Sequence, residues 1–259
     1  MEASVLLWTV LAVVLLMVST WTLSLVLKDA SIVDIVWGLG FVVVAWVARL
    51  TAHGVGSRQN LLVACTTIWG LRLGGYLFWR NHGKGEDFRY RAMRKHYGPR
   101  FPLISLLTVF GLQGVLMWTV SMPVQLGQMP NRPSLGILAF VGAALWLIGV
   151  VFETVGDVQL ARFKARLDSK GKVMDSGLWA WTRHPNYFGD FCVWWGLFLI
   201  AAETRLGLWG AIGPIVMSIL LLRVSGVAML EKTITKRRPG YAEYVARTSA
   251  FFPRPPRRL

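Results

Sequence analysis

Charged residues are scarce in this chain. They make up 16% of its 259 residues, against about 25% in an average soluble domain, which argues against an ordinary water-soluble globular protein. Acidic residues are the scarcer sign, 13 against 28 Lys and Arg, and the net charge is +15. The basic residues stand between apolar runs and form no continuous patch, so nucleic acid is not expected as a partner.

Cysteine is almost absent. Cys65 and Cys192 are the only two, and both lie inside apolar runs, so neither a disulfide framework nor a CxxC motif is available. Nucleotide-binding loops are missing as well. The string "GKG" at 83–85 lacks the GxxxxGK[ST] spacing, and no GxGxxG follows a strand-like run, which excludes a P-loop and a Rossmann site.

Long apolar runs are what the chain has instead. It is 54% hydrophobic with a mean hydropathy of +0.50, and seven runs are long enough, at about 20 residues, to cross a bilayer. Unpaired backbone groups are costly in lipid, so each run is predicted to be helical. The sequence predicts an all-α polytopic membrane protein, a single domain over 1–259. The expected spans are 4–27, 31–50, 60–80, 102–124, 134–158, 186–203 and 206–230.

Basic residues are distributed unequally between the two sides of these spans. One side collects 22 of the 28 Lys and Arg residues and the other only four, with Arg72 and Arg223 inside spans. The positive-inside rule places the basic side in the cytoplasm. The N-terminus is therefore predicted outside and the C-terminus inside. The first run is interpreted as a span and not as a signal peptide, because no basic residues precede it.

Ionisable residues within the spans are the candidates for function. Each costs roughly 2.5–3.5 kcal/mol on insertion scales, so such residues usually face a cavity or a partner. Most of them lie near the cytoplasmic ends, and an interfacial salt bridge such as Asp190 with Arg223 is the simpler alternative. They are Asp34, Arg72, Glu153, Asp157, Asp190 and Arg223.

Polar residues also gather in the predicted cytoplasmic segments. Glu153 and Asp157 are four residues apart and share one helical face, but no His accompanies them, so no metal site is expected. The basic loop 80–101 suits either phosphate or anionic lipid. His184 is a candidate ligand or general acid, or a hydrogen-bonded structural residue. The tail is either an amphipathic interfacial helix or a lid over a cytoplasmic pocket.

Several motifs together resemble the steroid 5α-reductase-like membrane family, in its bacterial branch, over essentially the whole chain. They are "DASIVDIVWGLGF" (29–41), "GKGEDFRYRAMRKHYG" (83–98), "TRHPNYFGDF" (182–191), "LLRVSGVAMLEK" (221–232) and "PGYAEYVARTSAFFP" (239–253). The resemblance implies a seven-helix, NADPH-dependent oxidoreductase acting on CH–CH groups. Its expected substrates are hydrophobic enones such as 3-oxo-Δ4 steroids, and its expected location is a multi-pass position in the bacterial inner membrane, in contact with membrane lipids.

The resemblance also implies which residues bind NADPH. The family's Asn and acid at the start of the sixth span correspond to Asn186 and Asp190, and its acid and base after the fifth span to Asp157 and Lys164. The other residues predicted to bind the cofactor, either by the resemblance or because they lie near these positions, are Arg89, Arg91, Glu153, His184, Tyr187, Arg223, Tyr241, Tyr244 and Arg247.

The implied catalytic residues match the family less closely. Steroid 5α-reductases place a Gln-Glu pair on the second span and a Tyr on the third, where this chain has Val33, Asp34 and Tyr76. A protonated Asp34, or Tyr76, is expected to donate a hydrogen bond to the developing enolate oxygen.

Two other function classes stay open. The "RHPxYxG" string is shared with the isoprenylcysteine carboxyl methyltransferases, which bind S-adenosylmethionine, but their later pair of acids is replaced here by Glu231 and Lys232. A lipid-binding or transport protein is the third class, although polar residues near the midplane of several helices, typical of transporters, are few. The oligomeric state is left open.

Overall fold

The computed structural model of the chain describes residues 2–52, 56–129, 135–224 and 240–257. Within these ranges the regular structure is helical, and the one strand-type pairing is an isolated parallel bridge between Thr182 and Ser249. The predicted all-α class is confirmed. The chain divides into two compact parts, unit 1 (Met1–Ala139 and Leu197–Gly213) and unit 2 (Phe140–Gly196 and Pro214–Leu259). The prediction of a single domain stays a prediction.

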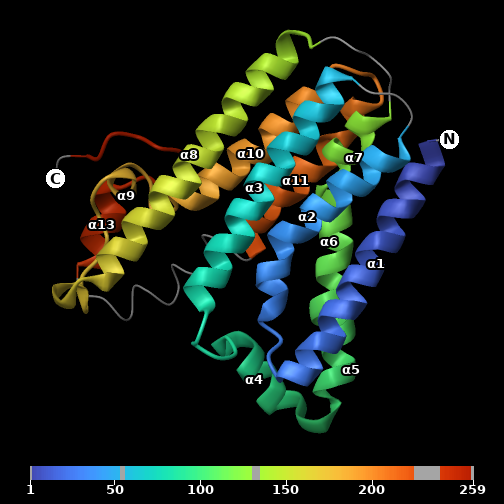
Figure 1. Cartoon of the computed structure of the whole chain (residues 1–259). Helices are drawn as coiled ribbons and strands as arrows, with labels where there is room; N and C mark the ends of the chain where they lie inside the picture. The colour runs from blue at the N-terminus through green and yellow to red at the C-terminus, as the bar shows by residue number, and fades with distance from the viewer. Residues whose placement is uncertain (1, 53–55, 130–134, 225–239, 258–259) are drawn as a thin grey trace. The chain divides into compact units, whose positions relative to one another are not determined.

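Unit 1 is a bundle of helices (Figure 1). Its α2 and α3 pack closely, because Gly38 and Gly70 have no side chains: a Cβ atom on Gly70 would lie 2.5 Å from the carbonyl oxygen of Gly38. The rings of Phe41 and Trp69 are fully buried, with centroids 5.6 Å apart. The helices are α1 (Glu2–Leu27), α2 (Ile32–Thr51), α3 (Ser57–Asn81), α4 (Phe88–Tyr97), η1 (Gly98–Arg100), α5 (Phe101–Ser105), η2 (Leu106–Gly111), α6 (Leu112–Val120), α7 (Met122–Gln128) and η4 (Gly207–Ala211).

The fourth apolar run is not one uninterrupted α-helix. It passes through the π-helical turn η2, and its α6 segment ends at Val120. Pro123, within the first turn of α7, lacks the backbone N–H that would continue the hydrogen-bond ladder of α6. The predicted span 102–124 is therefore too long at its end.

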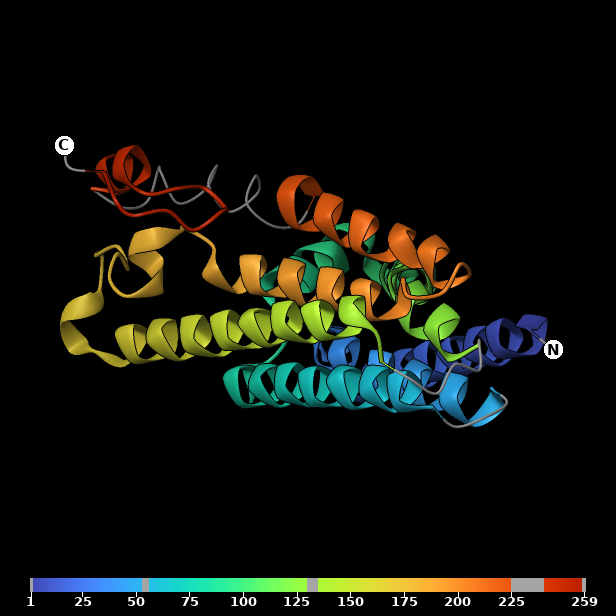
Figure 2. The same ribbon diagram turned by 90° about the horizontal axis from the view of Figure 1, so that it is seen from above.

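Unit 2 is built on two long antiparallel helices that lie side by side, α8 (Ile137–Ala165) and α10 (Pro185–Ala201), as Figures 1 and 2 show. The first residues of α8 and the last of α10 belong to unit 1. The shorter elements are η3 (Leu167–Ser169), α9 (Leu178–Trp181), α11 (Ile212–Ile219), which begins in unit 1, η5 (Leu220–Val224) and α13 (Tyr241–Arg247).

Five helical stretches in the described ranges are long and apolar enough to cross a membrane. They are Ser4–Leu27, Ile32–Thr51, Ser57–Asn81, Phe88–Val120 and Ile137–Ala165. Large apolar side chains on α1, such as Leu15 at 69% exposure, point away from the protein, as expected of a surface in contact with lipid. The chain is a helical membrane protein.

The sixth and seventh predicted spans are shorter in the structure. α10 has 17 residues, and the apolar stretch Gly207–Arg223 also falls below the length of a full span. The predicted seventh span, 206–230, continues into residues 225–230, which lie outside the described ranges. The count of seven and the orientation of the termini stay predictions.

Candidate functional site

Asp34, the predicted catalytic acid, is the centre of a polar cluster in unit 1. It lies in the first turn of α2, and its side chain is 19% exposed. Its Oδ2 is 2.7 Å from Nη2 of Arg89, and its Oδ1 accepts a 2.7 Å hydrogen bond from the hydroxyl of Tyr90. The Tyr90 hydroxyl in turn accepts a long bond from Gln113, at 3.4 Å. Asp34 was expected to donate a hydrogen bond, whereas in this arrangement both of its oxygens accept one.

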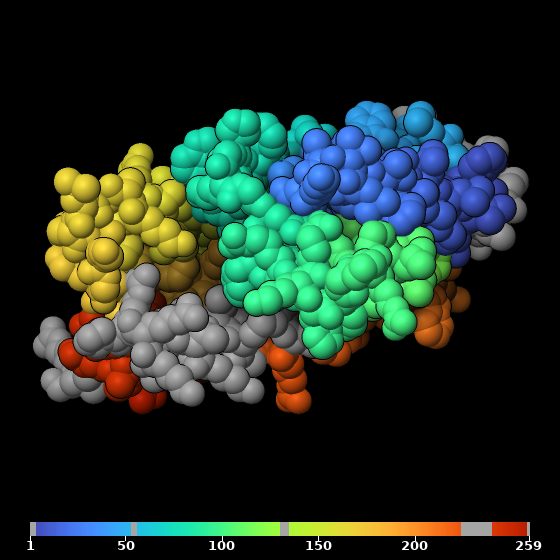
Figure 3. Space-filling view, turned by 90° about the horizontal axis from the view of Figure 1, so that it is seen from below, coloured from blue at the N-terminus to red at the C-terminus, as the bar shows by residue number. Residues whose placement is uncertain are grey.

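The connection between α3 and α4 carries Arg89 and Tyr90 to Asp34. Asp87 caps α4, because its carboxylate accepts the backbone N–H of Arg89 at 2.9 Å. The N–H of Asp87 donates to Ser31 Oγ at 3.2 Å, and the N–H of Ala30 donates to Glu86 at 2.8 Å. Figure 3 looks onto this end of unit 1, where the blue-green surface around α4 adjoins the blue surface of the N-terminal helices. The motifs 29–41 and 83–98 are therefore joined into one site.

Two carboxylates in this connection are held in the charged state. Burial of Glu86 raises the pKa of its carboxyl group, but two hydrogen bonds from Arg94, at 2.7 and 3.0 Å, and one from the N–H of Ala30 outweigh that effect and leave the pKa below its ordinary value. Burial also raises the pKa of Asp87, but the side-chain and backbone hydrogen bonds from Arg89 outweigh that effect and leave the pKa below its ordinary value. Charged partners thus fix α4 to the α1–α2 connection.

Tyr76 and Arg91 were also predicted in this region. The Tyr76 ring lies between the guanidinium groups of Arg72 and Arg80, whose carbons are 5.7 and 5.8 Å from its centroid. Arg91 is exposed on α4. Tyr90 was not predicted, although it is the tyrosine whose hydroxyl bonds Asp34. The capping motif "EDF" before it was the available signal, because it fixes where α4 begins.

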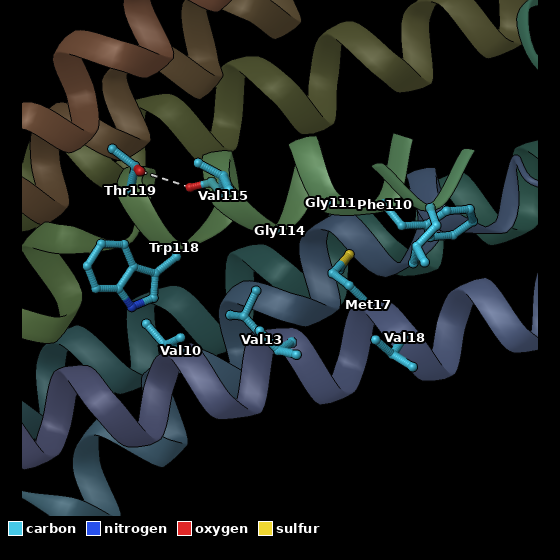
Figure 4. Close-up of a pocket in the computed structure, with 12 residues that line it drawn as sticks. Val10, Val13, Met17, Val18, Phe110, Gly111, Gly114, Val115, Trp118 and Thr119 are labelled. Carbon is cyan, nitrogen blue, oxygen red and sulfur yellow. Dashed lines mark hydrogen bonds between the residues drawn. The ribbon is translucent and has the colours of Figure 1, made fainter. Parts of the chain in front are cut away.

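An apolar groove of about 480 Å³ runs along α1 on one side and η2 with α6 on the other. Figure 4 shows Val13 and Met17 of α1 facing Phe110, Gly114 and Trp118. The absence of a side chain at Gly114 leaves room there, since Met17 Cγ is only 3.2 Å from where a Cβ would lie. No motif in the sequence pointed to this groove, because it depends on which faces of two distant segments meet.

The indole of Trp118 belongs to both this groove and a polar contact. Its N–H donates to the hydroxyl of Thr9 at 3.2 Å, and that hydroxyl donates to Oε1 of Gln125 at 2.6 Å. The groove is otherwise lined almost entirely by carbon. It therefore suits an apolar chain or ring system with little need for hydrogen bonds.

In unit 2, glycines bring α8 and α10 into backbone contact. A Cβ atom on Gly149 would lie 2.5 Å from the carbonyl oxygen of Gly189, and one on Gly196 would lie 2.6 Å from that of Gly142. Gly156 faces the ring of Pro185 at 3.2 Å. These glycines repeat every seven residues, close to two helical turns, so they fall on one face of each helix. The contact fixes the register of α8 against α10.

This register brings the predicted acids of α8 to the start of α10. Glu153 is 3% exposed and Asp157 is 5% exposed. The Cγ of Glu153 lies 2.7 Å from where a Cβ on Gly189 would stand, beside Asp190. A Cβ atom on Gly156, the residue before Asp157, would lie 3.5 Å from the backbone nitrogen of Asn186. The predicted acids of α8 and the predicted residues at the start of α10 are therefore gathered into one cluster, the α8–α10 cluster.

Aromatic and amide groups complete this cluster. The rings of His184 and Tyr187 stack nearly parallel, with centroids 5.5 Å apart, and His184 is buried. The side-chain oxygen of Asn186 accepts the N–H of Tyr187 at 3.1 Å. Within the described ranges no group of three or more His, Cys, Asp or Glu side chains could hold a metal ion.

The C-terminal segment folds back onto the chain that precedes α10. Arg183 donates to the carbonyl oxygens of Val245 and Thr248, at 3.2 and 2.9 Å, and Tyr244 donates to that of Trp179 at 2.6 Å. Arg247 pairs with Asp175. Burial, and then the neighbouring Tyr241, raise the pKa of Tyr244.

Residues 241–252, the tail, therefore pack against the segment 175–183, which leads into the α8–α10 cluster. Tyr244 and Arg247, predicted to bind the cofactor, hold the tail to this segment through their side chains. Tyr241 is buried beside Tyr244, with ring centroids 5.8 Å apart. Phe251 and Phe252 extend the attachment, with ring centroids 5.6 and 5.9 Å from Phe191 of α10.

The remaining predicted residues lie at helix ends. Lys164 is exposed in the last turn of α8, and Arg223 is exposed in η5. Glu231 and Lys232, which bear on the methyltransferase alternative, lie outside the described residues.

Comparison with known families identifies the chain. Residues 20–248 match the family described as "Protein of unknown function (DUF1295)". The chain belongs to the DUF1295 family. This DUF1295 chain is also similar to an uncharacterized protein of the fission yeast Schizosaccharomyces pombe, at 26% identity, with 90% of the chain and 75% of the relative covered. No solved structure matches it.

Proposed function

We propose that this DUF1295 protein is an NADPH-dependent membrane reductase that transfers hydride to the β-carbon of an enone lipid. The observation that carries the proposal is the α8–α10 cluster. Two carboxylates on one helix, nine-tenths or more buried, lie against the start of another helix that presents Asn186, Tyr187 and Asp190. Ionisable side chains buried in a membrane protein are rare and often mark a functional site.

The chemistry of this cluster fits a dinucleotide. Carboxylates accept hydrogen bonds from ribose hydroxyls and carboxamide N–H groups, and the side chain of Asn186 can both donate and accept. The stacked rings of His184 and Tyr187 offer a flat aromatic surface. Lys164 supplies a cation for phosphate in the last turn of α8. In this proposal Arg183, Tyr244 and Arg247 act indirectly, by fastening the tail to the segment before α10.

We assign activation of the substrate carbonyl to the cluster of Asp34, Arg89 and Tyr90. In the structure the Tyr90 hydroxyl donates its hydrogen bond to Asp34, which also pairs with Arg89. We propose that this hydroxyl exchanges its bond to Asp34 for one to the carbonyl oxygen when the substrate binds. A hydrogen bond from Tyr90 to the carbonyl oxygen stabilises the enolate that forms when hydride reaches the β-carbon. Protonation of the α-carbon then gives the saturated ketone. Bound NADPH supplies the hydride, and every other step needs only positioning and proton donation.

The apolar groove of α1, η2 and α6 supports a hydrophobic substrate. At about 480 Å³ it lies in the size range of small-molecule pockets, and its lining is nearly all carbon. A lipid with a rigid or chain-like apolar body suits such a lining better than a polar metabolite does.

The proposal is tested by enone-dependent oxidation of NADPH. Purified full-length protein in lipid nanodiscs receives NADPH and a 3-oxo-Δ4 steroid or another enone lipid, and the reduced nucleotide is followed by absorbance. The saturated ketone with the same skeleton is the control. We expect oxidation with an enone and none with its saturated counterpart. Methyl transfer from S-adenosylmethionine to a lipid, with no NADPH consumed for any enone, would contradict the proposal in favour of the methyltransferase class.

A further inference from the structure

The C-terminal segment of unit 2 lines a small, partly open cavity of its own. After α13 the chain turns at Thr248 and returns past the end of the helix, where the N–H of Arg257 donates to the carbonyl oxygen of Arg247 at 3.0 Å. The N–H of Arg254 is fixed in turn to the carbonyl oxygen of Trp181 at 3.0 Å. The pocket here has a volume of about 230 Å³. Figure 1 shows the backbone of the segments that line it, α13 and the red coil that follows.

The charged residues that line this cavity are all arginines. Arg247, Arg254 and Arg257 all border it, together with the polar residues Thr248 and Ser249. Asp175 pairs with Arg247, and among the described residues that line or pair with this cavity three guanidinium groups face one carboxylate. Guanidinium groups present several N–H donors in a fixed plane, which suits the oxygens of a phosphate group.

The backbone around the cavity does not oppose an anion. Carbonyl oxygens at the end of a helix normally repel negative charge. Here those of Val245 and Thr248 already accept hydrogen bonds from the buried Arg183, and that of Arg247 accepts the N–H of Arg257. These three carbonyl oxygens therefore already have donors and compete less with an anion for the arginine side chains.

Two exposed aromatic residues lie near Arg254, one close to it in sequence and one bonded to its backbone. Phe252, two residues before Arg254, is 53% exposed, and Trp181, which holds the N–H of Arg254, is 47% exposed. Aromatic rings beside basic residues are typical of the interface between membrane and water, where lipid phosphates lie. The cavity is also smaller than the roughly 300–1,000 Å³ of pockets that enclose a whole small-molecule ligand, so it suits a head group better than an entire nucleotide.

We propose that the pocket of Arg247, Arg254 and Arg257 binds the phosphate group of an anionic membrane lipid. The site is separate from the assignment of a reductase activity, because it rests on the tail alone. An anionic lipid held there anchors the C-terminal segment at the membrane surface, and through Arg183 and Trp181 it steadies the segment that precedes α10.

The test measures lipids retained by the full-length protein. Wild type and the Arg254→Gln, Arg257→Gln double variant are reconstituted with mixed phosphatidylglycerol and phosphatidylcholine, re-extracted in mild detergent and analysed by native mass spectrometry. We expect wild type to retain phosphatidylglycerol selectively. Each lost guanidinium is expected to weaken that retention about fivefold. The Lys95→Gln, Arg100→Gln pair removes the same charge from exposed positions of unit 1 and should leave retention near the wild-type level. Equal retention in wild type and the Arg254, Arg257 variant would overturn the proposal.

Further arms separate the sources of phosphate and the effect of charge. Inorganic phosphate should not displace the retained lipid, and displacement would show a site for free phosphate instead. NADPH affinity should be equal in wild type and the Gln pair, whereas a loss of NADPH affinity with unchanged lipid retention would assign the pocket to the nucleotide and overturn the lipid site. The Arg254→Lys, Arg257→Lys pair keeps the charge and should retain more phosphatidylglycerol than the Gln pair. If the Lys pair and the Gln pair lost phosphatidylglycerol retention equally, the positive charge of these residues would not be what binds the phosphate, and the proposal would fail.

Discussion

At the scale of single residues, the tyrosine that contacts Asp34 is Tyr90, on α4, and its hydroxyl donates to Asp34 at 2.7 Å. The resemblance to steroid 5α-reductases pointed to Tyr76 on the preceding helix. A sequence reading cannot place Tyr90, because its position depends on how the α3–α4 connection folds back to meet Ala30 and Ser31 through Glu86 and Asp87. Contacts of this kind join residues more than fifty positions apart and leave no local periodicity.

Replacing Tyr90 with Phe removes the proposed donor to the carbonyl and keeps the ring. We expect kcat for an enone to fall by about 10²–10³-fold, in the range for loss of one donor to a developing oxyanion, while the Kd for NADPH stays near wild type. Tyr97→Phe, on the exposed side of the same helix, is the matched control and should leave both unchanged. Equal losses of kcat and of NADPH affinity in Tyr90→Phe would mean that the residue is structural.

Asn186 and Asp190 carry the prediction about the cofactor. Asn186→Ala or Asp190→Asn should each weaken NADPH binding about tenfold, the effect of losing one well-placed hydrogen bond to a polar ligand. Equilibrium binding to the purified protein measures this, with Asn81→Ala of unit 1 as the control. Wild-type affinity in both variants would remove the start of α10 from the cofactor site.

At the scale of elements, the α8–α10 contact explains why the acids of α8 meet the residues at the start of α10. The stretch "VGAALWLIG" (141–149) contains no GxxxG pair of the kind that marks close helix contacts. The glycines recur every seven residues instead, on both helices, and this period also aligns one face. The site of unit 2 was predicted by residue type, while its geometry depends on this glycine spacing.

Gly189→Ala tests the helix contact. The new Cβ would lie 2.6 Å from the carbonyl oxygen of Gly149 and 2.7 Å from Glu153 Cγ. Because backbone must move to admit it, we expect a loss of about 1–3 kcal/mol in the free energy of unfolding, seen as a lower unfolding temperature in detergent. Gly75→Ala is the matched control, since nothing lies within 4 Å of its Cβ position in α3, and it should be neutral or slightly stabilising. A stable Gly189→Ala protein would mean that α8 and α10 are not in backbone contact.

The connection held by Glu86 should be sensitive to acid. The pKa of Glu86 is lowered in the folded protein, so its contribution to stability is present above the ordinary pKa of about 4.3 and is lost as the pH falls through the lower folded value. Glu86→Gln should cost about 1 kcal/mol near neutral pH, a modest figure because Arg94 is partly exposed.

Unfolding temperatures of wild type and Glu86→Gln, measured from neutral pH to about pH 3, check this prediction, since protonation removes the difference at the acid end. Asp168→Asn, which changes an exposed carboxylate in the loop after α8, should have little effect. A gap between wild type and Glu86→Gln that stays constant over the whole range would show that the Glu86 charge does not fasten α4.

At the scale of the whole molecule, hydropathy predicted the helical membrane class and the positions of five long helices to within a few residues at most ends. Its errors have local causes. Pro123 and a π-helical turn interrupt the fourth run, and α8 continues past the predicted 158 to Ala165, because "DVQLARFKA" is polar but favours a helix. The length of an apolar run predicts neither feature. It also does not test the predicted count of seven spans or the predicted cytoplasmic C-terminus.

The proposal of an NADPH-dependent reductase is tested by identifying the nucleotide that the freshly purified protein carries. The full-length protein is extracted from its membrane in mild detergent, denatured, and the released small molecules are identified by mass spectrometry. Asn186→Ala, purified in parallel, controls for nucleotide carried over from the cell. We expect NADPH or NADP⁺ from wild type and much less from the variant. Recovery of S-adenosylmethionine in place of a nicotinamide nucleotide would contradict it.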